Sequence, residues 1–452
     1  MKQDLTTGPL TRHLIKTASF MLVMMFFQTM YFLIDLYWVG RLGTDAVAAV
    51  GVSGNLTFVV LALTQMLGVG TTTVVSHAVG RKDHDEALLL FNQSQVLAMV
   101  TGVVFLVVGL AVRMTYANAL SADANTARLS GEFLMWMIPA MALQFGLVAM
   151  GAALRGIGNF KTGMIVGSAT IIVNMALAPI LIFGWVTGHP FGIAGAAMST
   201  FISIVVGLIW FATYFYPRDA YLRFVVADWK PRPHIWKRIL AIGLPTGFEF
   251  SMTAIYLFMI YAITRQFGAA AQAGFGIGGR VIQAGFMPIV ALGMAVAPVA
   301  GQNFGARQAD RVKRTFRDAA LMSGVVMFVF ALICAIAPHA MVQVFSNDPA
   351  VIAVGEDYLR IVSLTFIPSG LIFVASSMFQ AMGNTVPSLI SSGTRILLIA
   401  IPLPFLMRAA GFELNWIWYL SAVCVMVQLA LSMLLLRREF RRRLAWATPA
   451  EV

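Results

Sequence analysis

Three polar side chains share one face of a long apolar segment near the start of the chain. Gln28, Tyr31 and Asp35 lie in QTMYFLIDLYWVG, and a helix stacks residues at this spacing on one side. A carboxyl group that has hydrogen-bonding neighbours in a low-dielectric environment can take up and release a proton. The alternative is a structural hydrogen bond or ion pair. We favour a functional role for Asp35, because the helix interiors of the first half offer no obvious basic partner.

A second acid, Glu249, lies in the apolar segment GLPTGFEFS. Two interpretations stay open: it could be the counter-charge for a cationic substrate, or it could pair with Arg280 or Arg395, which also lie in apolar segments. Two other acids stand four residues from an arginine, where a helix allows an ion pair: Glu132 with Arg128, and Glu356 with Arg360.

The elements that must position these side chains are membrane helices. Of 452 residues, 59% are hydrophobic and 11% are charged, whereas soluble domains average about 25% charged residues. This composition excludes a soluble enzyme and a disordered chain. Cys334 and Cys424 lie in apolar runs, so we expect no disulfide framework and no metal site. No P-loop and no catalytic constellation is recognisable, so the sequence indicates neither an ATP-driven pump nor an enzyme.

Apolar runs near twenty residues predict twelve transmembrane helices and an all-α integral membrane protein. The predicted spans are 14–40, 46–79, 88–112, 128–154, 162–186, 191–216, 238–264, 270–303, 318–343, 352–382, 388–408 and 415–436.

The basic residues collect on alternate connections, and this predicts the orientation in the membrane. Lys and Arg crowd the N-terminus and the connections that include 81–82, 155–161, 217–238, 307–317 and 437–443. The opposite connections carry only Arg41, Arg113, Arg265 and Arg408. By the positive-inside rule, both termini are cytoplasmic in a multi-pass protein of the inner membrane. The net charge of +12 then reflects contact with anionic lipid and requires no nucleic acid partner.

The two halves of the chain are an internal repeat. Identities recur at one constant offset, the one that carries Gly43 to Gly268, Asp123 to Asp348 and Asn159 to Asn384. Each repeat has six helices, so both enter the membrane in the same, parallel orientation. We predict an N-lobe at 1–216 (helices 1–6), a cytoplasmic linker at 217–237, a C-lobe at 238–436 (helices 7–12) and a basic cytoplasmic tail at 437–452. Two such repeats favour a transporter over a channel or a receptor.

Several motifs resemble the multidrug and toxic compound extrusion (MATE) family over essentially the whole chain. They are GQNFGA at 301–306, the segment GFGIGGRVIQAGFMPIVALGMAVAP before it, LRGIGNFKTG, FQAMGNTVP and the helix that contains Asp35. The resemblance implies twelve helices in two six-helix lobes that form a V-shaped cleft. It also implies export of cationic or amphiphilic compounds in exchange for H⁺ or Na⁺.

The resemblance also implies an ion-coupling site in the first lobe. Carried over by motif, Asp35 is joined by Asn174 from NMALAPILIF and Thr200 from GIAGAAMST. The second acid of the family pattern falls on Ala178, which removes a ligand and a charge that Na⁺ would use. We therefore favour H⁺ over Na⁺ as the coupling ion, and we add Tyr31 and Gln28 to the candidate coupling residues.

The predicted function is a secondary multidrug antiporter that works by alternating access. Asp35, Glu249, its repeat counterpart Met24 and Arg280 are the candidate substrate-binding residues. We expect a monomer without cofactors whose partners are small-molecule substrates and membrane lipid. The alternative is a flippase for lipid-linked saccharide precursors of the same superfamily, which would use Arg280 and Arg395 to bind pyrophosphate.

Overall fold

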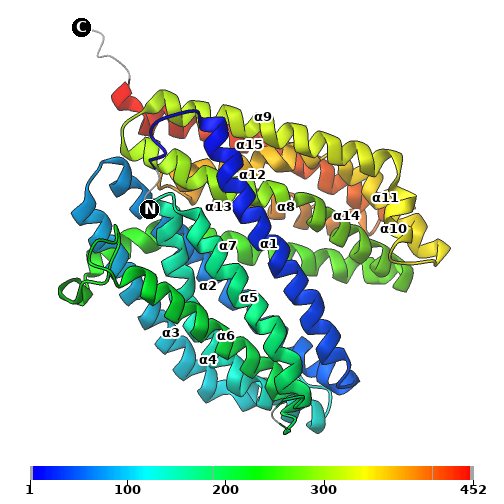
Figure 1. The fold of residues 1–452 in the computed structure, drawn as a ribbon. Coiled ribbons are helices and arrows are strands. Elements are labelled where there is room, and N and C mark those ends of the chain that lie inside the picture. Colours follow the sequence, from blue (N-terminus) through cyan, green and yellow to red (C-terminus); the bar gives the residue numbers. More distant parts are fainter. Residues whose placement is uncertain (1–3, 187, 410, 448–452) are drawn as a thin grey trace. The chain divides into compact units, whose positions relative to one another are not determined.

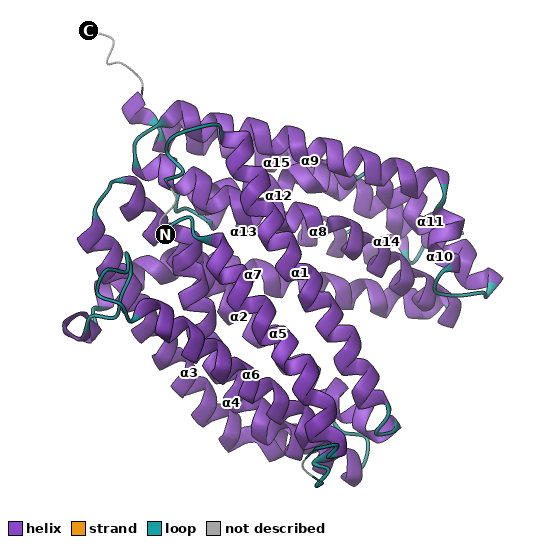
Figure 2. Ribbon diagram, in the orientation of Figure 1, coloured by secondary structure: helices purple, strands orange, loops and turns teal. Residues whose placement is uncertain are grey.

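The computed structural model describes residues 4–186, 188–409 and 411–447, and within these ranges every regular element is a helix (Figure 2). The chain divides into two compact units. Unit 1 holds Asp4 with Phe20–Gly247, and unit 2 holds Leu5–Ser19 with the residues from Phe248 on. The two units are described separately below.

Unit 1 contains most of the first repeat, and Figure 1 labels its helices along the chain. Its elements are α1 (Leu10–Gly40) from Phe20 on, α2 (Thr44–Gly80), α3 (His84–Leu120), α4 (Ala124–Gly156), α5 (Phe160–Phe183), α6 (Gly192–Phe215), the 3₁₀ turn η1 (Val226–Trp229) and the first half of α7 (Pro233–Thr264). Its largest apolar core joins α2, α3 and α4 with α6 and the start of α7, through side chains such as Leu67, Phe91, Phe145, Phe215 and Ile239.

Unit 2 contains the rest of α7 and the second repeat. Its further elements are η2 (Arg265–Phe267), α8 (Ala269–Gly305), α9 (Ala309–Ile336), α10 (Pro338–Gln343), α11 (Pro349–Ser363), α12 (Phe366–Ala381), α13 (Val386–Ala400), α14 (Leu403–Leu406), α15 (Leu414–Arg443) and η3 (Ala445–Ala447). Leu5, Leu10 and Leu14 at the start of the chain are buried in its core.

The predicted all-α membrane protein is confirmed in the described part of the chain. Eleven helices, or continuous helical segments, are long and apolar enough to cross a membrane, and the number reaches the predicted twelve when α11 and α12, which are bent by 58°, are counted as one span. Pro368 lies in the first turn of α12, where its missing N–H removes a helical hydrogen bond and favours the break. Two other predicted spans are interrupted for the same reason: Pro338 begins α10, and Pro402 precedes α14.

The repeat is also visible in the backbone of each unit. Lys82 and Arg307 are counterparts, and both adopt left-handed conformations, with φ of 61° and 56°. Asp123 and Asp348 are counterparts too, and each caps the helix that follows it, α4 or α11. The backbone N–H of Thr126 and then its hydroxyl donate to Asp123, and these bonds hold the pKa of that carboxyl below its usual range.

The boundaries of the two compact units differ from the boundaries of the two repeats. The start of α1 belongs to unit 2 and the start of α7 belongs to unit 1. Hydrogen bonds explain both assignments: Gln302 and Asn303 of α8 bind the backbone of Leu5, and Gln93 of α3 binds the backbone of Lys230. The predicted lobes at 1–216 and 238–436 follow the boundaries of the repeat, and they stay a prediction. Part of the predicted basic tail, 448–452, lies outside the described residues, as does Lys2.

Two glycines let α7 approach α2 closely within unit 1. A Cβ atom at Gly243 would overlap the carbonyl oxygen of Met66, and one at Gly70 would overlap that of Ile239. The backbone of α2 cannot move aside as a flexible side chain could. Because of this clash, we expect Gly243→Ala to lower the free energy of unfolding by about 1–3 kcal/mol. Thermal unfolding in detergent measures the effect. Gly54→Ala in α2 is the matched control, because its Cβ would meet no atom within 4 Å; equal melting temperatures for the two variants would contradict the prediction.

Candidate ion and substrate sites

A polar cluster in unit 1 joins three membrane helices. Asn174 of α5 donates to the Thr200 hydroxyl of α6 over 3.0 Å, and the Tyr31 hydroxyl of α1 lies 3.4 Å from the same oxygen. Asn174 is buried and the other two are half-buried. Three of the five predicted coupling residues therefore form one hydrogen-bonded set, centred on Thr200.

Asp35 lies one helical turn beyond Tyr31 on α1 and is half-buried. Its Oδ1 atom is fully buried and has no hydrogen-bond partner among the described residues. A buried polar atom without a partner is rare, because the lost hydration is not replaced. Asp35 therefore has one acceptor atom that no group in the described residues satisfies.

Gln28, the fifth predicted coupling residue, is exposed and makes no hydrogen bond within the described chain. Ser199 was not predicted and does adjoin the set: its hydroxyl lies 3.5 Å from Asn174 Oδ1 and also donates to the Ala196 carbonyl. The position of Ser199 directly before Thr200 could have pointed to it. That position alone is a weak indication, because a serine in a helix more often bonds its own backbone.

Ala178 occupies the position at which the resemblance implies a second acid, and it lies in an apolar environment. It is 1% exposed in a cluster with Val39, Ile182 and Ala197. An apolar cluster provides no oxygen ligand on this side of the polar set. Met24, the counterpart of Glu249, lies against α5, where its sulfur is 3.1 Å from the position that a Cβ of Gly167 would take.

Glu249 in unit 2 is held by serines. The Ser388 hydroxyl lies 2.9 and 2.8 Å from its two carboxylate oxygens, and Ser392 donates to Oε1 over 3.0 Å. Ser376 of α12 in turn lies 2.7 Å from Ser388. Ser388 and Ser392 are one helical turn apart on α13, and the segment PSLISSG shows that spacing in the sequence. The sequence did not reveal that these serines face Glu249 of α7.

Neither arginine pairs with Glu249 among the described residues. The guanidinium of Arg395 lies 4.7 Å from the ring centre of Tyr256, and its Nε is buried without a hydrogen bond. Arg280 is exposed on α8. The interpretation of Glu249 as the partner of an arginine therefore has no support, and its role as a counter-charge stays a prediction. The two local ion pairs are confirmed, Arg128 with Glu132 at 2.5 Å and Arg360 with Glu356 at 3.5 Å.

The fold and these sites define a multi-pass membrane protein with acidic and hydroxyl-bearing side chains inside both of its units. The sequence matches the MatE family at residues 21–180 and 245–406. The chain therefore belongs to the MatE family, the multidrug and toxic compound extrusion transporters.

Individual relatives match along most of their length. The chain is 24% identical over 391 residues to the probable multidrug resistance protein YoeA of Bacillus subtilis, covering 85% of this chain and 84% of the relative. It is 26% identical over 402 residues to the multidrug export protein MepA of Staphylococcus haemolyticus, covering 87% and 86%. A solved structure of a MOP superfamily transporter from Pyrococcus furiosus superimposes with a TM-score of 0.89 at 22% identity, covering 97% of this chain and 98% of the other. That last similarity concerns the fold.

Proposed function

We propose that this protein exports cationic or amphiphilic small molecules and that the downhill entry of protons drives the export. The observation that carries the proposal is the unpartnered, buried Oδ1 of Asp35 beside the set formed by Tyr31, Asn174 and Thr200. An ionisable group kept at membrane depth is costly, so its presence argues for a functional role. The names of the relatives YoeA and MepA support multidrug substrates.

The proposed coupling ion is H⁺. Na⁺ binds best where several hard oxygen atoms converge, and the apolar cluster around Ala178 supplies none. A proton requires only one acceptor, and Asp35 has one available. No cofactor and no catalytic step enter this mechanism.

The proposed substrate contacts are Asp35, Glu249, Met24 and Arg280. Glu249 is the main counter-charge, because its serine partners are neutral and leave its charge uncompensated. We further propose that the protein works as a monomer. The basic connections support a place in the cytoplasmic membrane with both termini inside. The flippase alternative is not favoured by the comparisons, since these relatives are named for multidrug export.

Efflux from proteoliposomes tests the proposal. Wild-type protein is reconstituted, a fluorescent monovalent cation such as ethidium is supplied, and a pH gradient or a Na⁺ gradient is imposed separately. We expect only the pH gradient to drive ethidium movement. Movement driven by Na⁺ alone would contradict proton coupling, and movement under neither gradient would contradict the antiporter.

A further inference from the structure

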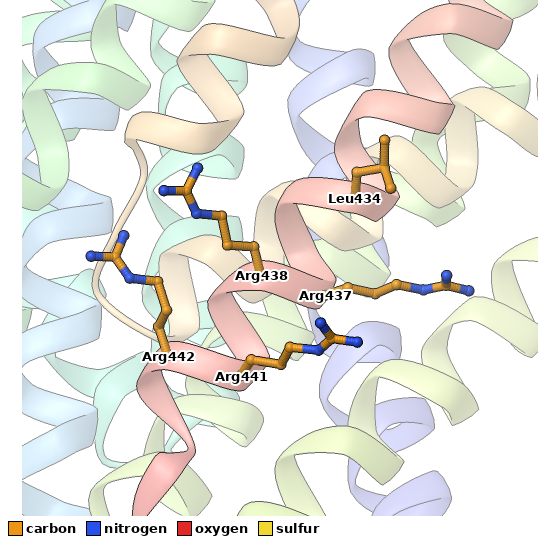
Figure 3. A pocket seen from close by; sticks show the side chains of 5 residues that line it. All are labelled: Leu434, Arg437, Arg438, Arg441 and Arg442. Carbon is orange, nitrogen blue, oxygen red and sulfur yellow. The ribbon is translucent and has the colours of Figure 1, made fainter.

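Four arginines lie on one face of the last turns of α15. With Leu434 they line a groove of about 400 Å³: Arg437, Arg438, Arg441 and Arg442 (Figure 3). In Figure 3 Arg437 and Arg441 point to one side and Arg438 and Arg442 to the other. The members of each pair are four residues apart, or about 6 Å along the helix axis. The face therefore presents two separate pairs of guanidinium groups.

These charges have no counter-charge within the described residues. None of the four arginines makes a hydrogen bond or an ion pair among the described residues, whereas the next one, Arg443, pairs with the buried Glu439 and donates to the Met382 carbonyl. Like charges four residues apart destabilise a helix, and the dipole at the helix C-terminus offsets only part of that repulsion. A bound anion would remove the remainder, and guanidinium groups bind phosphate in a bidentate manner.

The same face of α15 favours a lipid as the anion. Towards the middle of the helix this face exposes Val423, Met426, Val427 and Leu434, and the arginines follow directly. The opposite side, with Leu436 and Leu444, is buried in the core of unit 2. An exposed stripe that changes from apolar to basic within one turn matches a lipid, whose acyl chains are continuous with a charged headgroup. A free phosphate would leave Leu434 in the groove without a function.

We propose that this face binds an anionic phospholipid whose headgroup carries two phosphates joined by a short linker, one for each pair of arginines. The site lies outside the proposed ion and substrate sites. The proposal depends on the proposed topology in one respect, which is that the lipid belongs to the cytoplasmic leaflet. Its consequence is a lipid that anchors the end of unit 2 at a fixed depth in the membrane.

Native mass spectrometry of the delipidated full-length protein tests the proposal. The probes are cardiolipin, phosphatidylglycerol at twice the concentration so that the phosphate is matched, phosphatidylethanolamine and inorganic pyrophosphate. The variant is R437Q/R438Q/R441Q/R442Q. The control R307Q/K313Q/R314Q/R317Q removes the same charge from the start of α9 and the residues just before it. There the basic residues alternate with the acids Asp310 and Asp318.

We expect cardiolipin to bind the wild type and the control with similar affinity and the α15 variant at least about tenfold more weakly. Thermal unfolding without lipid checks that both variants are folded. Equal weakening in both variants would show diffuse charge attraction and overturn the proposal. Equal affinity of the wild type for cardiolipin and for phosphate-matched phosphatidylglycerol would also overturn the proposal, because it would show that the two-phosphate headgroup is not recognised. Displacement of cardiolipin by pyrophosphate at equal concentration would assign the site to a free anion.

Discussion

Replacing Asp35 by Asn is expected to reduce proton-driven efflux to the level of empty liposomes. Asparagine has nearly the same size as aspartate and can still make hydrogen bonds, but its amide cannot take up and release a proton near neutral pH. The buried Oδ1 without a partner is the atom on which the prediction depends. The measurement is ethidium movement under an imposed pH gradient, together with the proton flux recorded by a pH-sensitive dye inside the liposomes.

Asp85→Asn is the matched control for this variant. Asp85 is a fully exposed acid at the start of α3 and is outside the polar set of unit 1. We expect wild-type efflux from it. If Asp35→Asn were folded and kept its pH-driven efflux, Asp35 would be a structural residue and the coupling proton would bind elsewhere.

The second large effect is expected from Glu249→Gln, which should weaken the binding of a monovalent cation about tenfold or more. The substitution keeps the shape of the side chain and its contacts with Ser388 and Ser392, but it removes the charge. Isothermal titration with ethidium and with a neutral amphiphile of similar size separates the two contributions. The affinity for the neutral compound should change little, since it does not need a counter-charge.

Glu413→Gln serves as the control for Glu249→Gln. Glu413 is an exposed acid that precedes α15. A Glu249→Gln variant with unchanged ethidium affinity and a lowered melting temperature would indicate that Glu249 only links α7 to α13. Ser388→Ala provides a further comparison, because it retains the carboxylate charge while it removes the hydroxyl that contacts both oxygens.

Much of the candidate site was accessible from the sequence because the relevant signals are local. An acid within an apolar run identifies Asp35 and Glu249 without knowledge of their neighbours. The resemblance to the family then added Asn174 and Thr200, which the structure connects through a hydrogen bond. Serine partners could not be predicted in the same way, because Ser388 in a helix could equally bond a carbonyl of its own backbone.

The sequence by itself determined the membrane spans, the repeat and the distribution of basic charge, since hydropathy, a constant offset and loop composition are properties of the chain read in order. Only the tertiary structure decided which helices face one another. It assigned the starts of α1 and α7 to the units opposite their own repeats, and it surrounded Glu249 with hydroxyl groups instead of a guanidinium. The physical reason is that a hydrogen bond requires two groups within about 3 Å, and residues more than a hundred positions apart reach that distance only through the packing of the helices that carry them.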